Sequence, residues 1–426
     1  MPEQRAGGFA AEDLMYDWNE HVARAPGYPA DLSFCDETLR DGLQNPSVID
    51  PRLEDKVALL HRMDAVGIHV ANVGLPGASQ RNRDHALGLC REIERSRMRL
   101  RPVAAGRTLV ADVRPIIDIS QSVGLAIEVY VFIGSSPIRQ LTEDWDLPQM
   151  TRLSSEAIDL AVRAGLRVAF VIEDATRSRP EVLATMMKVA IDHGAGRVCL
   201  ADTVGQATPP GVEALIGFTR LVLAETGAKG IGIDWHGHND RGLALANALH
   251  ALRCGADRAH GTALGIGERV GNAPMELLLV NLKLCGLLDE QDLRGLPAYC
   301  QMAASIMGWT VPVNYPVVGR DAFRTATGVH ASAIMKAETK GQQWLADRVY
   351  SSIPAGWFGR TQQIGIGWMS GASNVVHWLH SHGIPPTNEL VAAVLVKAKS
   401  EDHILTNDEL MAIVRSHMES LRVGER

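Results

Sequence analysis

The sequence alternates eight times between a short apolar run, rich in valine and isoleucine, and a longer segment with the period of an amphipathic helix. The apolar runs predict strands at residues 32–37, 68–73, 100–105, 125–134, 167–172, 197–201, 231–236 and 257–262. Eight strand–helix repeats over about 255 residues match a (β/α)8 TIM barrel of typical length. A doubly wound open sheet is the alternative, but no G-x-G-x-x-G follows the first strand.

The chain of 426 residues is longer than one barrel needs, so further segments are expected at both ends. We expect an N-terminal arm at residues 1–31, the barrel at 32–289, and small, mostly helical subdomains at 290–426. Helix-start signals agree with the repeats, since Ser79 precedes one helical segment and Pro209-Pro210 opens another.

Charge and cysteine content exclude several classes of partner. The net charge is −7 and no run of five basic residues occurs, so neither nucleic acid nor a membrane surface is expected as a partner. The six cysteines show no C-x-x-C spacing, which favours reduced thiols in a cytoplasmic protein. Neither a secretory apolar region nor an apolar run of 18 residues is present.

Two histidines, His236 and His238, come at the end of the seventh predicted strand. In extended backbone, residues i and i+2 point to the same face, so both imidazoles can reach one point. Neutral imidazole is the commonest metal ligand. The spacing alone leaves two interpretations open. The histidines are either two of the three protein ligands of a divalent-metal site or a pair of hydrogen-bonded histidines at a strand terminus.

The ends of the other predicted strands also collect polar residues, where a TIM barrel places its catalytic groups. These stretches are Asp36–Gln44 after strand one, Asn72 after strand two, Glu173–Arg177 after strand five, Asp202-Thr203 after strand six and Gly265–Asn272 after strand eight. A carboxylate from strand one would join the two histidines in a site of two nitrogens and one oxygen with open positions. Such a site is typical of a catalytic metal.

Six motifs in order resemble one known superfamily. They are DETLRDGLQ at 36–44, EDATRS at 173–178, ADTVG at 201–205, HGHND at 236–240, GIGERVGN at 265–272 and ATGVHA at 326–331. Together they resemble the DRE-TIM metallolyase superfamily, and within it the Claisen-condensing synthases of 2-isopropylmalate, homocitrate and citramalate. The resemblance implies a divalent metal (Mg²⁺, Mn²⁺ or Zn²⁺), acetyl-CoA as co-substrate and a 2-oxo acid as substrate.

The resemblance also implies roles for individual residues. Asp41, His236 and His238 would be the metal ligands, with Asn272 at or next to the metal. Arg40 would bind substrate and neutralise the developing oxyanion, a task suited to a permanently charged guanidinium.

The resemblance also gives further candidates for substrate binding. Thr203 resembles the threonine that binds the 2-oxo acid carboxylate, and Gln44 would orient that carboxylate or a metal ligand. Glu173 resembles an acidic catalytic residue, and Asn72 and Arg107 are also candidates for substrate contact. Without the resemblance, Thr203 would be interpreted as a capping residue and Glu173 as a solvated charge.

The segment after the barrel resembles the lid and dimerisation subdomains of these synthases. His330 would be supplied to the barrel of the neighbouring subunit, with Tyr350 beside it, to help deprotonate acetyl-CoA. This implies an obligate homodimer. About 40 residues follow Pro386, so no long leucine-binding regulatory domain is expected.

Three departures from the family pattern bear on the substrate. Asn72 replaces a strand-two glutamate that buttresses the arginine, so Arg40 is expected to lose a neighbouring charge. Arg139 replaces the histidine of an S-P-I-H motif. The homocitrate-specific histidine of strand three has no match in Ala104–Arg107.

Three functions remain in competition. A synthase like 2-isopropylmalate synthase leads, and homocitrate- or citramalate-type synthesis with another 2-oxo acid is its variant. A lyase like hydroxymethylglutaryl-CoA lyase is second, but GIGERVGN stands where that branch has a cysteine-bearing loop, and the tail is too long. A non-catalytic barrel is third, suggested only by Asn72 and opposed by the retention of Arg40 and Asp41.

Overall fold

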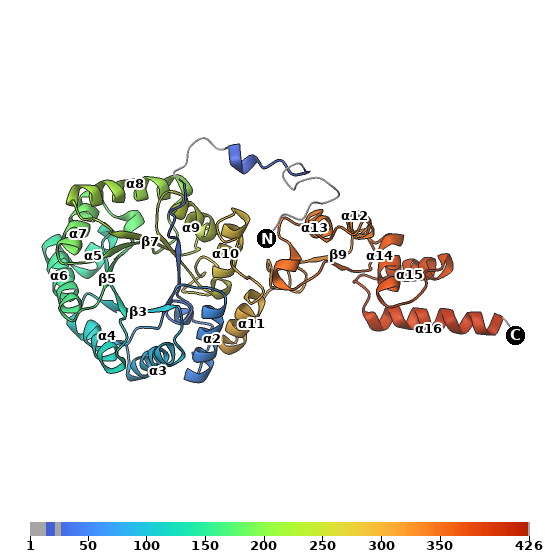
Figure 1. Ribbon diagram of the computed structural model, residues 1–426, viewed down its shortest axis with the longest axis horizontal. Coiled ribbons are helices and arrows are strands. Elements are labelled where there is room, and N and C mark those ends of the chain that lie inside the picture. Colours follow the sequence, from blue (N-terminus) through green and yellow to red (C-terminus); the bar gives the residue numbers. More distant parts are fainter. Residues whose placement is uncertain (1–13, 22–26, 425–426) are drawn as a thin grey trace. The chain divides into compact units, whose positions relative to one another are not determined.

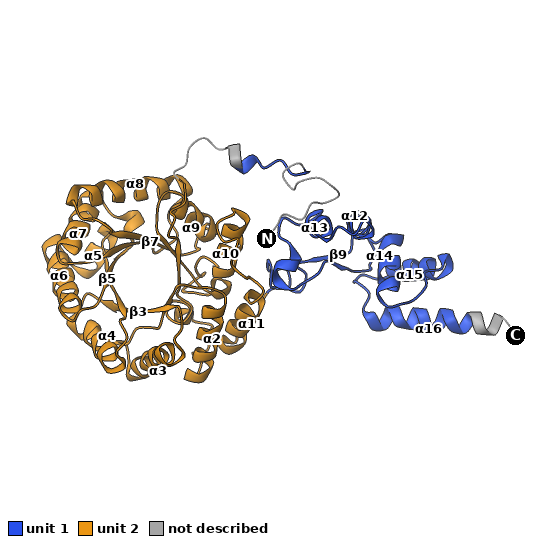
Figure 2. Ribbon diagram, in the orientation of Figure 1, with its two compact units in different colours: residues 1–22, 312–426 blue, residues 23–311 orange. Residues whose placement is uncertain are grey.

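The computed structural model describes residues 14–21 and 27–424. The chain divides into two compact units (Figure 2), one of residues 23–311 and the other of residues 312–426 together with the N-terminal residues up to 22. Of the expected N-terminal arm at 1–31, residues 1–13 and 22–26 lie outside the described residues, and Trp18–His21 form a 3-10 turn.

The first unit is a closed barrel of eight parallel strands in sequence order, with β8 paired to β1 (Figure 1). The strands are β1 Ser33–Asp36, β2 Val70–Asn72, β3 Arg101–Arg107, β4 Glu128–Gly134, β5 Val168–Glu173, β6 Arg197–Asp202, β7 Gly232–Gly237 and β8 Arg258–Gly261. Each overlaps its predicted range, so the prediction of a TIM barrel is confirmed.

Helices separate the strands and surround the barrel (Figure 1). They are α2 Leu53–Ala65, α3 Gln80–Ser96, α4 Val110–Val123, α5 Pro137–Glu143, α6 Leu147–Arg163, α7 Pro180–Asp192, α8 Pro209–Thr226, α9 Ala244–Arg253 and α10 Met275–Leu284. The predicted start signals act as expected. Ser79 accepts a hydrogen bond from the Asn82 amide at 3.1 Å, and Pro209 is the first residue of α8.

A tenth helix of the described part of this unit, α11 (Leu296–Met307), packs against α2. Its buried Tyr299 donates a hydrogen bond to Asp36 at the end of β1. The unit that contains the barrel therefore extends to Val311, beyond the expected boundary at residue 289.

The inside of the barrel follows the two-residue alternation of its strands. Cys35, Val103, Tyr130 and Ala169 belong to one buried interior cluster contributed by different strands. Because alternate residues of a strand share a face, the residues two positions further along point into the barrel mouth. The interior core thus supports the polar groups that follow the strand ends.

The second unit is mostly helical, as predicted. Its elements are β9 Arg324–Thr325, α12 Gly328–Thr339, α13 Gln343–Arg348, β10 Gln363–Ile364, α14 Ala372–Ser381, α15 Asn388–Ser400 and α16 Asn407–Gly424. A two-stranded sheet pairs β9 with β10. Two separate apolar clusters, one around Ile334 on α12 and one around Trp378 on α14, give it two small cores.

Two further predictions concern the described residues as a whole. Among residues 14–21 and 27–424, no helix has the length and apolar character needed to cross a bilayer. All six cysteines are free thiols, in agreement with the spacing argument.

Candidate active site

A cavity of about 280 Å³ lies at the carboxyl ends of the barrel strands. Most of the predicted site residues line it: Arg40, Asp41, Gln44, Glu173, Thr203, His236 and His238. They come from β1, β5, β6 and β7 or from the loops that follow, because parallel strands of a barrel end at the same face. The remaining lining is partly apolar, with Leu75, Ala105, Phe132, Val171 and Ala201.

Asp41, His236 and His238 converge on one point of this cavity. Asp41 Oδ2 lies 3.4 Å from His236 Nε2 and 3.1 Å from His238 Nε2. One ligand atom from each of the three residues falls within 4.8 Å of the others, and all three side chains are buried. The two histidines meet because they lie two positions apart across Gly237, as the alternation of an extended strand requires.

The hydrogen bonds around the triad show what it can hold. His238 Nδ1 lies 2.7 Å from the Thr203 carbonyl oxygen, which can only accept, so the ring hydrogen sits on Nδ1. In the neutral ring, the Nε2 lone pair then faces the negatively charged Asp41 oxygen. Two lone pairs at this distance repel each other unless a cation lies near both, so the arrangement fits a divalent metal.

The protonation states favour the same interpretation. Burial lowers the pKa of His236 to about 4 despite the opposing effect of Asp41, so the imidazole is neutral near pH 7. Burial would raise the pKa of Asp41, but the neighbouring Arg40 guanidinium holds it well below its ordinary value. A neutral imidazole and an ionised carboxylate are the forms that bind metals.

Asn272 does not line the cavity but contacts the triad through Asp41. Its Nδ2 donates to Asp41 Oδ2 at 2.6 Å, while its buried Oδ1 has no hydrogen-bond partner among the described residues. An unpaired buried amide oxygen next to the triad is a further oxygen donor suited to a cation. Gly267 makes room for it, because a Cβ at that position would lie 1.7 Å from Asn272 Oδ1.

Arg40 is fixed by a buried carboxylate from its own loop. Its Nε and NH2 groups each lie 2.7 Å from Glu37 Oε2, and its NH1 donates to Gln44 Oε1 at 3.2 Å. Position 72 is neutral, as predicted, but Arg40 still has a negative neighbour because Glu37 supplies one. Asn72 instead donates from Nδ2 to the same Glu37 oxygen at 3.0 Å.

Thr203 and Glu173 lie on another wall of the cavity. Thr203 Oγ1 accepts a hydrogen bond from the Asp174 amide at 2.7 Å, which leaves its hydroxyl hydrogen available to a ligand. Glu173 forms a 3.1 Å ion pair with Arg139 Nε, the arginine that replaces the S-P-I-H histidine. Burial raises the pKa of Glu173, and Arg139 opposes this effect only in part.

Two predicted substrate-binding residues do not line the cavity. Arg107 donates from Nε and NH2 to Asp112 at 2.7 and 3.0 Å, and this pairing holds its side chain at the surface, where it is 60% exposed. Asn72 is fully buried, and its side chain donates a hydrogen bond to Glu37 and accepts one from the Gly74 amide.

His330 and Tyr350 belong to the second compact unit, and the structure brings them together. Their rings stack with centroids 3.8 Å apart, and Thr325 Oγ1 lies 3.5 Å from His330 Nδ1. Tyr350 is 49% exposed. The pair is therefore formed within one chain and is open to a ligand or another surface.

Comparison with known proteins identifies the family. The model of the HMGL-like family matches residues 31–302, well over half of the chain. The chain belongs to the HMGL-like family. This places it in the DRE-TIM metallolyase superfamily, as the six motifs predict.

Relatives of this HMGL-like chain bear the names of three synthases. Homocitrate synthase AksA of Methanocaldococcus jannaschii is 31% identical over 90% of this chain and 90% of its own length. A probable 2-isopropylmalate synthase of Ignicoccus hospitalis is 30% identical over 92% of this chain and 93% of its own. A putative (R)-citramalate synthase CimA of Methanosphaerula palustris is 29% identical, covering 91% and 73%.

Solved structures show the same barrel. The HMG-CoA lyase of Bacillus subtilis superposes with a TM-score of 0.57 at 21% identity, covering 67% of this chain and 97% of its own. At that identity the likeness concerns the fold alone. It agrees with the closed eight-stranded barrel described above.

The sequence analysis assigned no individual role to several residues that line this HMGL-like cavity, namely Glu37, Tyr130, Cys199, His260 and Glu268. The sequence contains a signal for one of these residues, Glu37. Glu37 lies two residues after Cys35, an interior residue of β1, and so points into the barrel by strand alternation. The partners of the others come from distant strands, which a single sequence does not reveal.

Proposed function

We propose that the barrel cavity catalyses a metal-dependent Claisen condensation of acetyl-CoA with a 2-oxo acid. Hydrolysis of the thioester then releases CoA and a 2-alkylmalate-type product. The observation that carries this proposal is the buried triad of Asp41, His236 and His238 directly beside Arg40 in one cavity. The names of the relatives, all synthases that would use such a pair of substrates, support it.

The 2-oxo acid would bind at the triad. A divalent cation held by Asp41, His236 and His238 would supply Lewis acidity to its keto group. Arg40 would stabilise the negative charge that develops on the keto oxygen when the keto carbon is attacked, because a cation already held in place by Glu37 needs no reorganisation. Thr203 would donate its hydroxyl hydrogen to the substrate carboxylate.

The acetyl group would be activated on the Glu173 wall. A carboxylate with a raised pKa is suited to accept the proton of the acetyl methyl group, and the resulting enolate carbon attacks the keto carbon. We propose that His330 and Tyr350 of the partner subunit complete this side of the site, which makes a homodimer the active form. Water then cleaves the thioester, and the thiol of CoA leaves.

The side chain of the 2-oxo acid would face the apolar lining made by Leu75, Phe132 and Val171. This lining favours an apolar side chain, as in a reaction of the 2-isopropylmalate synthase type. A 2-oxo dicarboxylic acid is the second candidate because the AksA relatives are named homocitrate synthases. Against it, Arg107 pairs with Asp112 away from the cavity.

The test is CoA release, followed with a thiol reagent, from acetyl-CoA and a panel of 2-oxo acids with Mg²⁺, Mn²⁺ or Zn²⁺. We expect metal-dependent release with a branched or linear apolar 2-oxo acid, and its loss in His236→Ala. The matched control is His193→Ala, since His193 is a 38% exposed histidine at the end of α7 on the outer ring of helices.

The alternative functions predict different results. Release with 2-oxoglutarate alone would favour the homocitrate type. Cleavage of a 3-hydroxyacyl-CoA without any condensation would favour the lyase. Absence of both reactions in the metal-loaded dimer would contradict the proposed function.

A further inference from the structure

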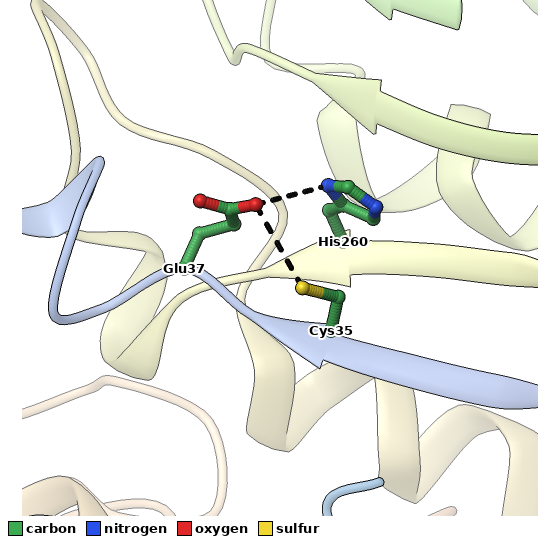
Figure 3. Close-up of side chains that lie close together, drawn as sticks. All are labelled: Cys35, Glu37 and His260. Atoms are coloured by element: carbon green, nitrogen blue, oxygen red, sulfur yellow. Dashed lines mark hydrogen bonds and ion pairs between the residues drawn. The ribbon is translucent and has the colours of Figure 1, made fainter. Parts of the chain in front are cut away.

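The barrel interior directly beneath Arg40 contains buried charges that the condensation itself does not use. Glu37 and His260 are at most 2% exposed, and Asp234 is fully buried. Figure 3 shows one Glu37 oxygen facing both His260, on β8, and Cys35, on β1. Buried charges are costly unless they are paired, so their arrangement requires a physical reason.

The two oxygens of Glu37 have separate tasks. Oε2 accepts hydrogen bonds from Arg40 Nε at 2.7 Å and from Asn72 Nδ2 at 3.0 Å. Oε1 faces His260 Nδ1 at 3.2 Å and accepts from the thiol of Cys35 at 3.7 Å. The carboxylate is therefore held from both sides, and Arg40 is fixed through it.

His260 is held in turn by groups deeper in the barrel. Its Nε2 lies 3.3 Å from Asp234 Oδ2, and Tyr130 donates its hydroxyl hydrogen to the same oxygen at 3.0 Å. Asp234 Oδ1 accepts from Arg197 Nε at 2.6 Å. His260 thus bridges two carboxylates, one anchored in the barrel and one in contact with Arg40.

We propose that Glu37 and His260 are positioning residues for Arg40, in a buried chain that runs from Asp234 through His260 and Glu37 to the guanidinium. The chain would hold Arg40 at the keto oxygen of the bound 2-oxo acid, so the inference rests on the proposed function. Glu37, directly after β1, would thereby position Arg40, a role that the neutral Asn72 on β2 cannot fill with a charge.

A second metal site is the competing interpretation, because Cys35, Glu37 and His260 each offer a ligand atom within 4.8 Å of the others. The existing contacts oppose it. Glu37 is already paired with Arg40 and His260 with Asp234, and burial favours the neutral thiol of Cys35. A cation there would have to displace these partners.

The positioning role is tested by ligand binding as well as by turnover. Oxalate, a stable mimic of a 2-oxo acid carboxylate and its keto oxygen, is titrated calorimetrically into the Mn²⁺-loaded enzyme. We expect Glu37→Gln to weaken oxalate binding about 10-fold and to lower kcat more than it raises KM, with Mn²⁺ affinity unchanged. Oxalate binding is measurable even if no condensation occurs, so failure of the proposed function and failure of this inference are distinguishable.

A double-mutant cycle separates positioning from a general structural effect. In an Arg40→Met background, Glu37→Gln should change oxalate affinity less than 2-fold, because there is no guanidinium left to position. Equal losses in both backgrounds would overturn the inference. A second variant combines Glu37→Gln with Asn72→Glu and should recover most of the oxalate affinity. The side chain of residue 72 already contacts the Glu37 oxygen that Arg40 contacts, so a glutamate there would place a carboxylate next to Arg40.

His260 is tested by a matched pair of variants. His260→Asn keeps a donor near the position of Nδ1 and should retain oxalate affinity within about 3-fold, whereas His260→Leu should lose about 10-fold. Equal oxalate affinities in the two variants would overturn the positioning role of His260. Metal content decides the competing interpretation: one Mn²⁺ per chain, unchanged in Cys35→Ser, supports positioning, and a second equivalent lost in Cys35→Ser overturns it.

Discussion

Asp41 is the residue on which the candidate metal centre depends, because its Oδ2 is shared by His236, His238 and Asn272. Replacing Asp41 by Asn keeps the shape and removes the charge. We expect the affinity for Mn²⁺ to fall by more than about 100-fold, because a neutral amide is a much poorer ligand than a carboxylate. Electron paramagnetic resonance titration of free Mn²⁺ measures the change.

The matched control for Asp41 is Asp112→Asn. Asp112 is also a buried carboxylate next to an arginine, but its partner is Arg107, outside the cavity. It should bind Mn²⁺ like the wild type. Full Mn²⁺ binding by Asp41→Asn would disprove the assignment of the metal ligands.

Glu173 gives a prediction on pH. Burial raises its pKa, so it is protonated at a higher pH than an ordinary glutamate, and a base works only when deprotonated. Activity should therefore fall as the pH drops through this raised pKa. Arg139 opposes the shift, so Arg139→Gln should raise the pKa further and move the acidic limb of the kcat/KM profile to higher pH.

The control for Arg139 is Arg152→Gln, which removes an exposed arginine paired with Glu156 on the outer helix α6. Its profile should coincide with that of the wild type. An acidic limb that does not move in Arg139→Gln would mean that Glu173 is not the group that titrates.

Residues differ in how far the sequence alone could place them. His236 and His238 could be predicted to converge because strand alternation is a local rule. Arg107 looked equally suitable, yet Asp112 holds it at the surface. Arg139 and Glu173 meet across two different elements, and no local pattern reveals such a pair. Local geometry was predictable, and the choice of partners was not.

The loop GIGERVGN is the element that brings Asn272 to Asp41. Gly267 lies against the Asn272 side chain, and Gly271, at φ 89°, lies against the Gly265 carbonyl. In Gly267→Ala, the added Cβ would have to displace Asn272 Oδ1, from which it would lie 1.7 Å away. We expect Mn²⁺ affinity to fall about 10- to 100-fold while the barrel stays folded.

The matched control is Gly217→Ala in the exposed face of α8, where a Cβ meets nothing within 4 Å. It should leave Mn²⁺ binding unchanged and raise the free energy of unfolding by about 0.5–1 kcal/mol, since alanine favours a helix. Thermal unfolding and Mn²⁺ titration of both variants check this. Wild-type Mn²⁺ affinity in Gly267→Ala would contradict the role given to the loop.

At the scale of elements, the positions of the strands were predictable, whereas the hydrogen bonds that hold the loops after them were not. Each predicted strand overlaps an observed one because the hydrophobic period is a local signal. The loops after β5 and β6 are braced by contacts between them: Asp202 accepts from the Thr176 hydroxyl at 2.8 Å. Asp174 adopts a left-handed backbone, φ 60°, and pairs with Arg177. Much of EDATRS and ADTVG thus has a structural role, in addition to the catalytic role that we propose for Glu173 and Thr203.

For the whole molecule, the sequence does not show that α11 joins the compact unit of the barrel. The last barrel helix, α10, ends at Leu284, within the expected range of 32–289, whereas the compact unit reaches Val311 through α11. The cause is long-range: Tyr299 donates to Asp36, and the sequence does not show that pairing. The separate unit beyond it contains the stacked pair of His330 and Tyr350.

The proposed homodimer makes a prediction about mixed subunits. If His330 serves the barrel of the partner subunit, Asp41→Asn and His330→Ala should each be nearly inactive but should complement each other when co-expressed. A mixed dimer has one intact barrel that receives an intact histidine, so random assortment should restore about a quarter of wild-type activity. Differently tagged chains, purified over both tags, enrich the mixed dimer and should give about half of wild-type activity per dimer.

The control is co-expression of Asp41→Asn with His236→Ala, which should restore no activity if both residues act in the triad of one barrel. Complementation would be absent if His330 acted within its own chain, and this outcome would reject the shared site while leaving the metal centre intact.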